Sequence, residues 1–297
     1  MSALLEVNDL HVTYGGVTAV RELSLSLPPG HLMAVLGANG AGKTSTLRAL
    51  TGLVPAAAGT VVFDGADVTG ATPERLAHLG IAHVPAGRGI FGTLSVADNL
   101  RLGLYGASAD RSAAGRQRLA DLLETFPVLA EKRSQPACQL SGGQQQQLAI
   151  ARALVQAPRL LLLDEMSMGL SPKIVTELFG IVAGLRDRGT AIIMVEQFVG
   201  QALKVSDSVL VLEQGRVVAT GRPGDLSGDD VAAAYLGGNQ AHDLLHVPPP
   251  PATAREVIEI EVPGRHIRDL ERLAATTGTT VSELVQGSID RLLADRP

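Results

Sequence analysis

Several short stretches of the chain are apolar at nearly every position, which indicates strands that are covered on both faces. This pattern is typical of a parallel sheet between two layers of helices. Residues 160–163 are four consecutive leucines and predict a central strand of such a sheet. The same pattern occurs at residues 32–36, 81–84 and 191–195. These strands predict an α/β fold with a mainly parallel core.

Other stretches alternate between apolar and polar residues, which predicts strands with one solvated face. Two such runs lie within residues 4–27, separated by Tyr14-Gly15-Gly16, and a further strand is expected at residues 60–63. They predict an antiparallel β subdomain. Residues 209–212 and 216–219 flank a Glu-Gln-Gly turn and predict a hairpin.

Apolar residues at helical spacing predict helices in four parts of the chain. Residues 45–53 and 73–79 predict short helices, and residues 96 to about 133 predict a helical subdomain. A further helix follows residue 141 and begins with four glutamines, residues 144–147, which we expect on its solvated face. The apolar face of the helical subdomain contains Leu119, Leu122, Leu123 and Phe126.

The chain of 297 residues divides into a large body and a small unit. The large body, residues 1–238, is followed by residues 239–254, where four consecutive prolines predict an extended linker. Residues 255–297 predict a strand and two helices, a β-α-α module. Because so few residues rarely form a stable monomeric core, we expect this module to dimerise or dock.

Bulk composition excludes several classes of protein. Hydrophobic residues make up 45% of the chain, but no stretch is long and apolar enough to span a bilayer, and the N-terminus lacks signal-peptide features. The net charge of −5 argues against binding of nucleic acid along the whole chain. Cys138 is the only cysteine, so an internal disulfide is excluded, and we expect a buried, unreactive thiol. These features fit a cytosolic protein.

The glycine-rich stretch at residues 37–45 carries the clearest chemistry. It follows a predicted strand, precedes a predicted helix and has the spacing of a phosphate-binding loop. Its backbone N–H groups form a cradle for phosphate oxygens. Lys43 is expected to contact the β- and γ-phosphates of a bound nucleotide, and the Thr44 hydroxyl to bind Mg²⁺. The expected phosphate-binding residues of the loop are Gly37, Asn39, Gly40, Ala41, Gly42, Lys43, Thr44 and Ser45.

Two carboxylates, Asp164 and Glu165, follow the four leucines directly. The carboxyl edge of such a strand is where open α/β sheets bind ligands. Asp164 is expected to hold Mg²⁺, and Glu165 to orient or deprotonate the attacking water. An acidic cap for the following helix is the alternative.

Two further binding positions are predicted from the residues alone. A further helix is expected to begin at Ser141-Gly142-Gly143-Gln144. The free backbone N–H groups at its N-terminus predict a second anion site. Tyr14 lies at a turn, where its ring is expected either to stack on a purine or to pack internally.

The ordered set of residues 37–44, 140–144 and 160–165 resembles the ATP-binding subunit of ATP-binding-cassette (ABC) transporters. Residues 84–88, 164–172, 195–197 and 235–238 are most similar to the ATPase subunits of branched-chain amino acid importers. Urea or short-chain amides are further cargo classes of this kind. The resemblance implies a P-loop NTPase cassette on the cytoplasmic face of the membrane. It also implies separate permease subunits, and a periplasmic or lipoprotein solute-binding protein as an indirect partner.

This resemblance also implies a head-to-tail dimer, formed either by two copies or with a sister subunit. Ser141, Gly142, Gly143 and Gln144 of one subunit would complete the ATP site of the other. Tyr14 would stack on adenine, and Gln197 would contact the γ-phosphate from the position usually held by His.

Three other departures from the family pattern stand at Ala86, Met166 and Gln144. Ala86 replaces the usual Gln or Glu, which puts communication between nucleotide and permease in doubt. Met166 replaces a usual Pro and Gln144 a common Glu, and both changes are expected to be tolerated.

Residues 255–297 resemble a ribbon-helix-helix unit of small bacterial repressors, in which paired strands read DNA. Residues 252–297 contain six Arg and no Lys against eight Asp and Glu, so phosphate binding is disfavoured. We therefore expect a dimerisation module; a DNA-binding module and an unrelated helical hairpin are the alternatives.

These features predict an ATPase coupled to import of branched-chain amino acids or a related small polar solute. Two alternatives remain at this stage. One is a soluble ABC-type ATPase acting on nucleic acid or ribosomes, and the other is an ATP-sensing regulator acting through its tail.

Overall fold

A computed structural model describes residues 3–104, 113–196 and 198–226. By its internal contacts the chain divides into two units, residues 1–246 and 247–297. The second unit lies outside the described residues, as do the predicted linker and the ribbon-helix-helix-like module. The following paragraphs concern the first unit only.

The predicted antiparallel subdomain is a four-stranded sheet with the order β2-β1-β4-β5. Residues of β1 alternate between the core and solvent over much of their length, which matches the alternation in the sequence. Tyr14 ends β1 and pairs with Val17, so the turn between β1 and β2 consists of two glycines. The strands are β1 (Leu5–Tyr14), β2 (Val17–Leu27), β4 (Ala58–Phe63) and β5 (Ala66–Asp67).

The second sheet has six strands in the order β10-β9-β3-β8-β7-β6. Strands β9, β3, β8, β7 and β6 are parallel, and β10 joins β9 as an antiparallel hairpin. The carboxyl ends of the parallel strands therefore meet at one edge. The strands are β3 (Leu32–Leu36), β6 (Ile81–Val84), β7 (Leu160–Asp164), β8 (Ala191–Val195), β9 (Ser208–Glu213) and β10 (Arg216–Gly221).

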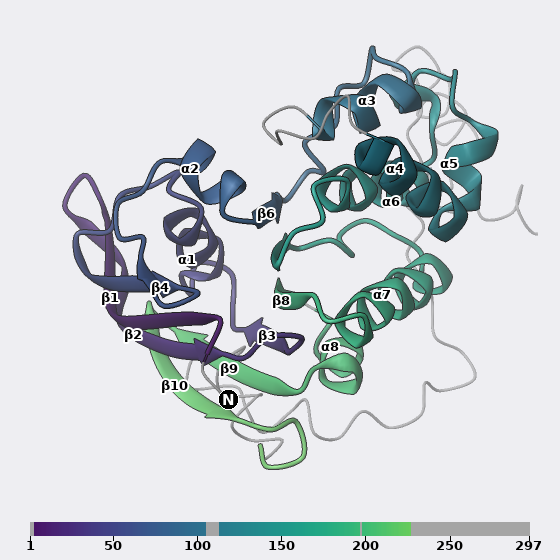
Figure 1. The fold of residues 1–297 in the computed structure, drawn as a ribbon. Coiled ribbons are helices and arrows are strands. Elements are labelled where there is room, and N and C mark those ends of the chain that lie inside the picture. Colours follow the sequence, from purple (N-terminus) through teal and green to yellow (C-terminus); the bar gives the residue numbers. More distant parts are fainter. Residues whose placement is uncertain (1–2, 105–112, 197, 227–297) are drawn as a thin grey trace, which may run out of the picture. The chain divides into compact units, whose positions relative to one another are not determined.

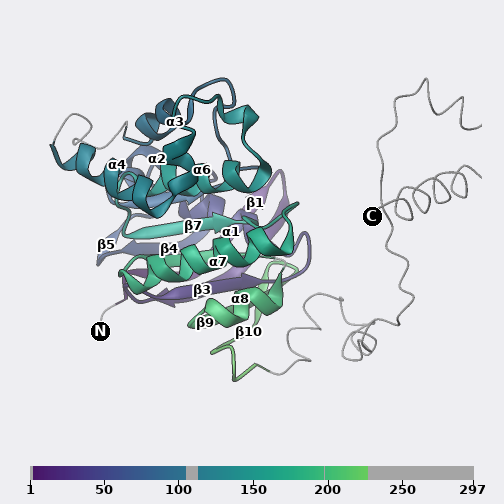
Figure 2. The ribbon, with the colours of Figure 1, turned by 90° about the vertical axis from the view of Figure 1, so that its right-hand side faces the viewer.

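The helices divide between the sheets and a helical subdomain. Helices α3 to α6 group on one side of the unit, away from β1 and β2 (Figure 1). Figure 2 shows α3, α4 and α6 at the top, with β9 and β10 at the bottom. The helices are α1 (Lys43–Leu50), α2 (Pro73–His78), α3 (Val96–Gly103), α4 (Ala113–Thr125), α5 (Pro127–Glu131), α6 (Gly142–Leu154), α7 (Pro172–Asp187) and α8 (Val199–Val205). The parallel core, antiparallel subdomain and helical subdomain confirm the predicted cassette fold.

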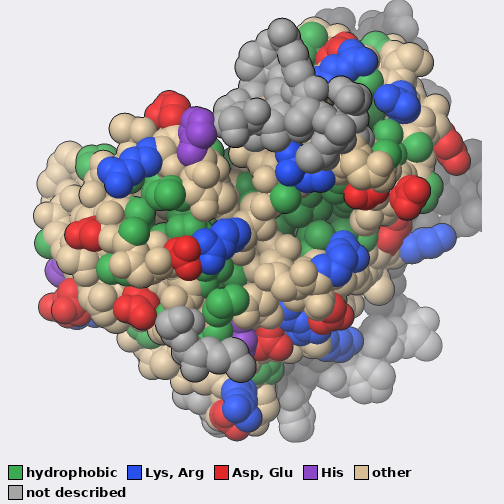
Figure 3. Space-filling model, in the orientation of Figure 1, with side chains coloured by type: hydrophobic (Ala, Val, Ile, Leu, Met, Phe, Trp, Pro, Cys, Tyr) green, Lys and Arg blue, Asp and Glu red, His purple; other side chains and the backbone are tan. Residues whose placement is uncertain are grey.

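Acidic and basic side chains are interspersed on the face shown in Figure 3. Several Lys or Arg side chains there lie beside Asp or Glu. Ion pairs also join Arg159 with Asp64 at 2.5 Å, and Arg186 of α7 with Asp207 at 3.3 Å.

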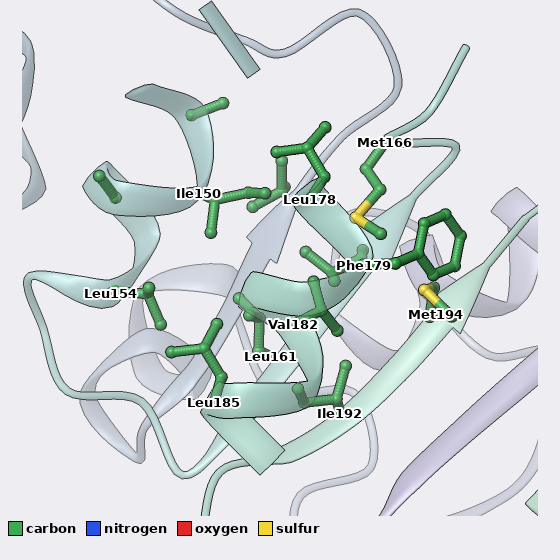
Figure 4. Close-up of a cluster of buried hydrophobic side chains, with 14 of the residues drawn as sticks. Ile150, Leu154, Leu161, Met166, Leu178, Phe179, Val182, Leu185, Ile192 and Met194 are labelled. Atoms are coloured by element: carbon green, nitrogen blue, oxygen red, sulfur yellow. The ribbon is translucent and has the colours of Figure 1, made fainter. Parts of the chain in front are cut away.

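Successive residues of β7 enter two different cores, which explains why the strand is apolar throughout. Leu161 and Leu163 belong to the cluster under α7, whereas Leu160 and Leu162 face the cluster shared with α1 and the antiparallel sheet. Figure 4 shows the first cluster, where α7 packs against β7 and β8. The labelled side chains are Ile150, Leu154, Leu161, Met166, Leu178, Phe179, Val182, Leu185, Ile192 and Met194.

The predicted helical stretch from residue 96 to about 133 is interrupted. Among the described residues it forms three helices, and the third begins at Pro127, which fits the first turn of a helix but not its interior. The apolar face is confirmed, since Phe126 is buried and three leucines pack against the same core. These leucines are Leu119, Leu122 and Leu123.

The first predicted helix is also shorter than expected, because it begins at Lys43 and ends at Leu50 rather than at residue 53. The Thr51 hydroxyl donates to the Leu47 carbonyl at 2.9 Å, and Gly52 turns the chain with φ +69°. Leu53 is consequently 57% exposed.

Two burial predictions were wrong. Cys138 is exposed, because Ala137 and Leu140 are the buried residues of its short 3₁₀ turn, and i, i+3 residues share one side of such a turn. Gln146 and Gln147 are buried rather than solvated. Gln147 donates to Glu177 at 2.8 Å, so α6 buries this amide at low cost.

Candidate nucleotide-binding site

The loop between β3 and α1 lies so close to neighbouring backbone that two of its glycines have no room for a side chain. A Cβ at Gly37 would lie 2.2 Å from the carbonyl oxygen of Leu212, and one at Gly42 would lie 2.5 Å from that of Ala19. Both also have positive φ, +147° and +104°, which favours glycine. The loop is therefore fixed by strands β2 and β9, and its N–H groups precede the N-terminus of α1.

Lys43 crosses this loop with its ammonium group. Its Nζ donates to the carbonyl oxygens of Gly37 at 2.7 Å and Ala38 at 3.0 Å. Lys43 is 4% exposed. Burial lowers its pKa below the usual value, although the charges of Glu165 and Asp164 oppose that shift. An ammonium group has three hydrogens, so these two bonds leave a donor for a phosphate oxygen.

Asp164 ends β7 and lies beside the first turn of α1. Its Oδ1 accepts a hydrogen bond from the Thr44 hydroxyl at 3.1 Å. Asp164 is 1% exposed, and burial raises the pKa of its carboxyl group, with the nearby charge of Glu165 adding to the shift. The Thr44 hydrogen bond, Arg48 and Lys43 act in the opposite direction. A cation at this carboxylate would stabilise the ionised form.

The Thr44 and Asp164 oxygens fit a magnesium ion. Mg²⁺ prefers hard oxygen donors and binds through one or two protein oxygens together with water and phosphate. The 3.1 Å contact brings such a pair together at the edge of the loop.

Glu165 leaves β7 in an unusual backbone conformation, with φ +47°. Its N–H donates to the Val195 carbonyl at 2.9 Å, which continues the pairing of β7 with β8 for one more residue. A cavity of about 140 Å³ lies between Glu165 and the loop. Its lining residues are Ala19, Asn39, Gly40, Gly42, Lys43, Thr44, Ser45 and Glu165.

Ala41 and Tyr14, two of the predicted ATP-binding residues, do not line the cavity. Ala41 is buried and its carbonyl accepts from the Gly215 N–H at 2.9 Å, so it supports the loop from beneath. Tyr14 is 39% exposed at the end of β1 and does not line the cavity, whereas Ala19 of β2 does. Its stacking on adenine stays a prediction. Gln197 lies outside the described residues.

Ser141, Gly142, Gly143 and Gln144 begin α6 and do not line this cavity. Ser141 and Gln144 form a reciprocal cap: the Ser141 hydroxyl accepts from the Gln144 N–H at 3.4 Å, and Gln144 Oε1 accepts from the Ser141 N–H at 3.1 Å. A Cβ at Gly143 would lie 2.6 Å from Ile174, so glycine allows α6 to approach α7. The fold thus joins the loop with Asp164 and Glu165, but leaves residues 141–144 elsewhere on the same chain.

Two further side-chain contacts were not foreseen from the sequence. Arg88, with φ +72°, donates to Gln145 Oε1 of α6 at 2.6 Å. Ser167 donates to the buried carboxylate of Glu196 through both its N–H and its hydroxyl. The sequence could have indicated Glu196, because it directly follows a buried apolar strand. The same pattern led to the prediction of Asp164.

The loop, the two carboxylates and the sheet define a P-loop nucleotide-binding protein. Residues 20–168 match the ABC transporter family. The chain is 39% identical over 237 residues to the high-affinity branched-chain amino acid transport ATP-binding protein BraG of Pseudomonas aeruginosa, covering 79% of this chain and 100% of BraG. It is 34% identical to the lipopolysaccharide export system ATP-binding protein LptB of Escherichia coli K12, covering 79% of this chain and 98% of LptB.

Among solved structures, the ADP conformation of MJ1267, an ATP-binding cassette of an ABC transporter, superposes with a TM-score of 0.67. The two are 26% identical, and the match covers 75% of this chain and 92% of MJ1267. The chain belongs to the ABC transporter family, and it is an ATP-binding cassette ATPase. Among the described residues, no helix has the length and apolar character required to cross a membrane.

Proposed function

We propose that this chain is the ATP-hydrolysing subunit of an importer for branched-chain amino acids or a related small polar solute. The observation that carries the proposal is the similarity to BraG, which extends over the whole of that relative. The similarity to LptB, an export protein, supports the ATPase and leaves the cargo to the permease partners. A periplasmic or lipoprotein solute-binding protein would act indirectly through those partners.

The residues of the site have distinct roles in this proposal. Lys43 and the N–H groups of the loop bind the β- and γ-phosphates of ATP, and Thr44 and Asp164 hold Mg²⁺. Bound Mg²⁺ neutralises charge on the phosphate oxygens. Glu165 accepts a proton from the attacking water, and Gln197 donates a hydrogen bond to the γ-phosphate. The raised pKa of Asp164 belongs to the metal-free protein, since a bound cation favours the carboxylate.

A second cassette completes each site. Ser141, Gly142, Gly143 and Gln144 of one subunit contact the ATP held by residues 37–45 of the other, and Tyr14 stacks on the adenine. The separation of α6 from the cavity within one chain supports this arrangement, because a single copy supplies only part of the expected contacts. Either a second copy or a sister subunit could be the partner.

The membrane partner needs a docking surface on the cassette. A groove of about 340 Å³ lies between the end of α1, α2, α3 and α6. Its exposed apolar side chains are Leu53, 57% exposed, and Phe91, 52% exposed; Arg152 lies over the Phe91 ring at 5.4 Å. The groove is lined by residues 81–83 of β6 and by Phe91, so a permease segment bound there would contact the chain on both sides of Ala86 in the sequence. We place the protein on the cytoplasmic face of the membrane, bound through this groove.

The experiment is to isolate the tagged full-length chain from detergent-solubilised membranes of its source and identify the chains that co-purify. Two membrane-spanning permease chains, together with loss of leucine uptake when the gene is deleted, would support the proposal. Unchanged leucine uptake with loss of another solute would overturn the cargo assignment. Recovery of nucleic acid or ribosomes without a membrane protein would instead support the soluble alternative.

A further inference from the structure

The turn that carries Glu165 holds a conformation that a non-glycine residue avoids. A left-handed backbone at such a residue costs about 1–2 kcal/mol. It persists where the surrounding structure determines it. Glu165 has φ +47°, and it is the residue of this turn that lines the nucleotide cavity. Something in the fold must therefore hold the backbone on both sides of Glu165.

On the N-terminal side, the holding contact is the extension of the sheet. The Glu165 N–H donates to the Val195 carbonyl at 2.9 Å, directly after the last paired residue of β7. On the C-terminal side, the Met166 side chain is 1% exposed and enters the core beside Phe179 and Met194 (Figure 4).

The third contact is polar and completely buried. The Ser167 N–H donates to Glu196 Oε1 at 3.2 Å, and the Ser167 hydroxyl donates to Glu196 Oε2. Glu196 is 0% exposed and Ser167 is 1% exposed. A buried carboxylate is costly unless hydrogen bonds satisfy it, and an apolar residue would fill this space more cheaply. The presence of a carboxylate at this buried position is therefore explained by its hydrogen bonds to Ser167 rather than by packing.

We propose that Ser167 and Glu196 are positioning residues that fix the turn of Glu165 and so aim its carboxylate at the water that attacks ATP. The inference rests on the proposed role of Glu165 in hydrolysis. Glu196 also directly precedes Gln197, so the pair ties the two segments that carry the proposed catalytic side chains. Ser167 and Glu196 act on the turnover step and not on ATP binding, since neither lines the cavity.

The first test removes the Ser167 hydroxyl. Ser167→Ala is expected to lower kcat about 10- to 100-fold, because a small misplacement of a catalytic group has an effect of that order. The KM for ATP and the Kd measured by nucleotide fluorescence are expected to change less than about twofold. Ser206→Ala is the matched control, because the Ser206 hydroxyl is also buried but makes no hydrogen bond among the described residues. A normal kcat in Ser167→Ala would overturn the inference.

The second test separates positioning from general damage. In a Glu165→Gln background, Ser167→Ala is expected to change the residual single-turnover rate by less than about twofold, because the group that it positions is already inactive. A further tenfold loss in that background would show that Ser167 does not act through Glu165, and the inference would fail. If Glu165→Gln alone turns over normally, the proposed role of Glu165 fails, whatever Ser167 does.

Glu196→Gln decides the question if Ser167→Ala does not fold. The amide keeps the shape of the side chain but is neutral. Its NH₂ group would donate to the Ser167 hydroxyl, so a weaker neutral hydrogen bond replaces the charge-assisted one. A fall in kcat of about fivefold with unchanged Kd is expected. An unchanged kcat would contradict the inference.

Discussion

The hydroxyl of Thr44 donates to the carboxylate of Asp164 at 3.1 Å, although the two residues are 120 positions apart in the chain. Thr44 belongs to the first turn of α1, and Asp164 ends β7. The contact brings the phosphate-binding loop to the edge of the parallel sheet. It also makes a pair of oxygens available to one cation.

Thr44→Val should raise the Mg²⁺ concentration for half-maximal ATPase activity by about tenfold or more, because valine keeps the shape but has no oxygen. Thr44→Ser keeps the hydroxyl and is expected to stay within about threefold of the wild type. The measurement is ATPase activity across a Mg²⁺ titration at saturating ATP. Equal Mg²⁺ dependence in Thr44→Val and the wild type would remove Thr44 from the metal site.

Gly37→Ala should destabilise the fold by about 2 kcal/mol or more, because the new Cβ would lie 2.2 Å from the Leu212 carbonyl oxygen at a backbone angle unfavourable to alanine. Gly180→Ala is the matched control, since Gly180 lies within α7 with no atom near its Cβ position. That variant is expected to gain about 0.5–1 kcal/mol from helix propensity. Urea unfolding measures both changes, and a neutral Gly37→Ala would contradict the close approach of β9 to the loop.

His83 of β6 should make the folded protein sensitive to acid. Burial, with a smaller contribution from Arg48, lowers its pKa from 6.5 to about 4, and its Nε2 is buried without a hydrogen bond among the described residues. Between these two pH values the unfolded chain binds a proton that the folded chain does not, so stability falls as the pH decreases from 6.5 towards 4.

The comparison is between the wild type and His83→Leu, by urea unfolding at pH 7 and pH 5. The wild type is expected to lose about 2 kcal/mol more than the variant over this interval. Equal losses in the two proteins would mean that His83 does not contribute to the acid sensitivity.

Deleting residues 239–297 should weaken self-association and leave nucleotide binding intact, because the phosphate-binding loop and both carboxylates precede the deletion. Sedimentation velocity at low micromolar concentration measures the first effect, and nucleotide fluorescence the second. Equal sedimentation of the deletion variant and the full-length chain would contradict the proposed dimerisation role of residues 255–297. DNA binding by the full-length chain that is lost on deletion would favour the repressor-like alternative.

The apolar runs in the sequence correctly predicted the strands of the parallel core. A strand such as β7 is covered on both faces, so its whole sequence must be apolar, and four leucines show this without knowledge of the fold. The glycines of the loop were equally informative, because the backbone angles and close approaches at Gly37 and Gly42 exclude side chains.

The features that the sequence did not reveal depend on distant partners. Gln147 looked solvated because its acceptor, Glu177, is thirty residues away on α7. Cys138 looked buried because the sequence does not indicate which residues of a short turn face the core. The pairing of Ser167 with Glu196 joins two loops, each following a different strand, and neither loop has a periodic pattern. The trans role of Ser141 stays a prediction, because it concerns a second molecule.

The most direct test of the central claim is a structure of the full-length Glu165→Gln protein with ATP and Mg²⁺, in which slow hydrolysis preserves the nucleotide. The account predicts a dimer of cassettes in which the triphosphate contacts Lys43 of one subunit and Ser141 of its partner, with Mg²⁺ beside Thr44 and Asp164. A nucleotide bound at a distance from Lys43 and Asp164, or enclosed by the residues of a single copy, would contradict it.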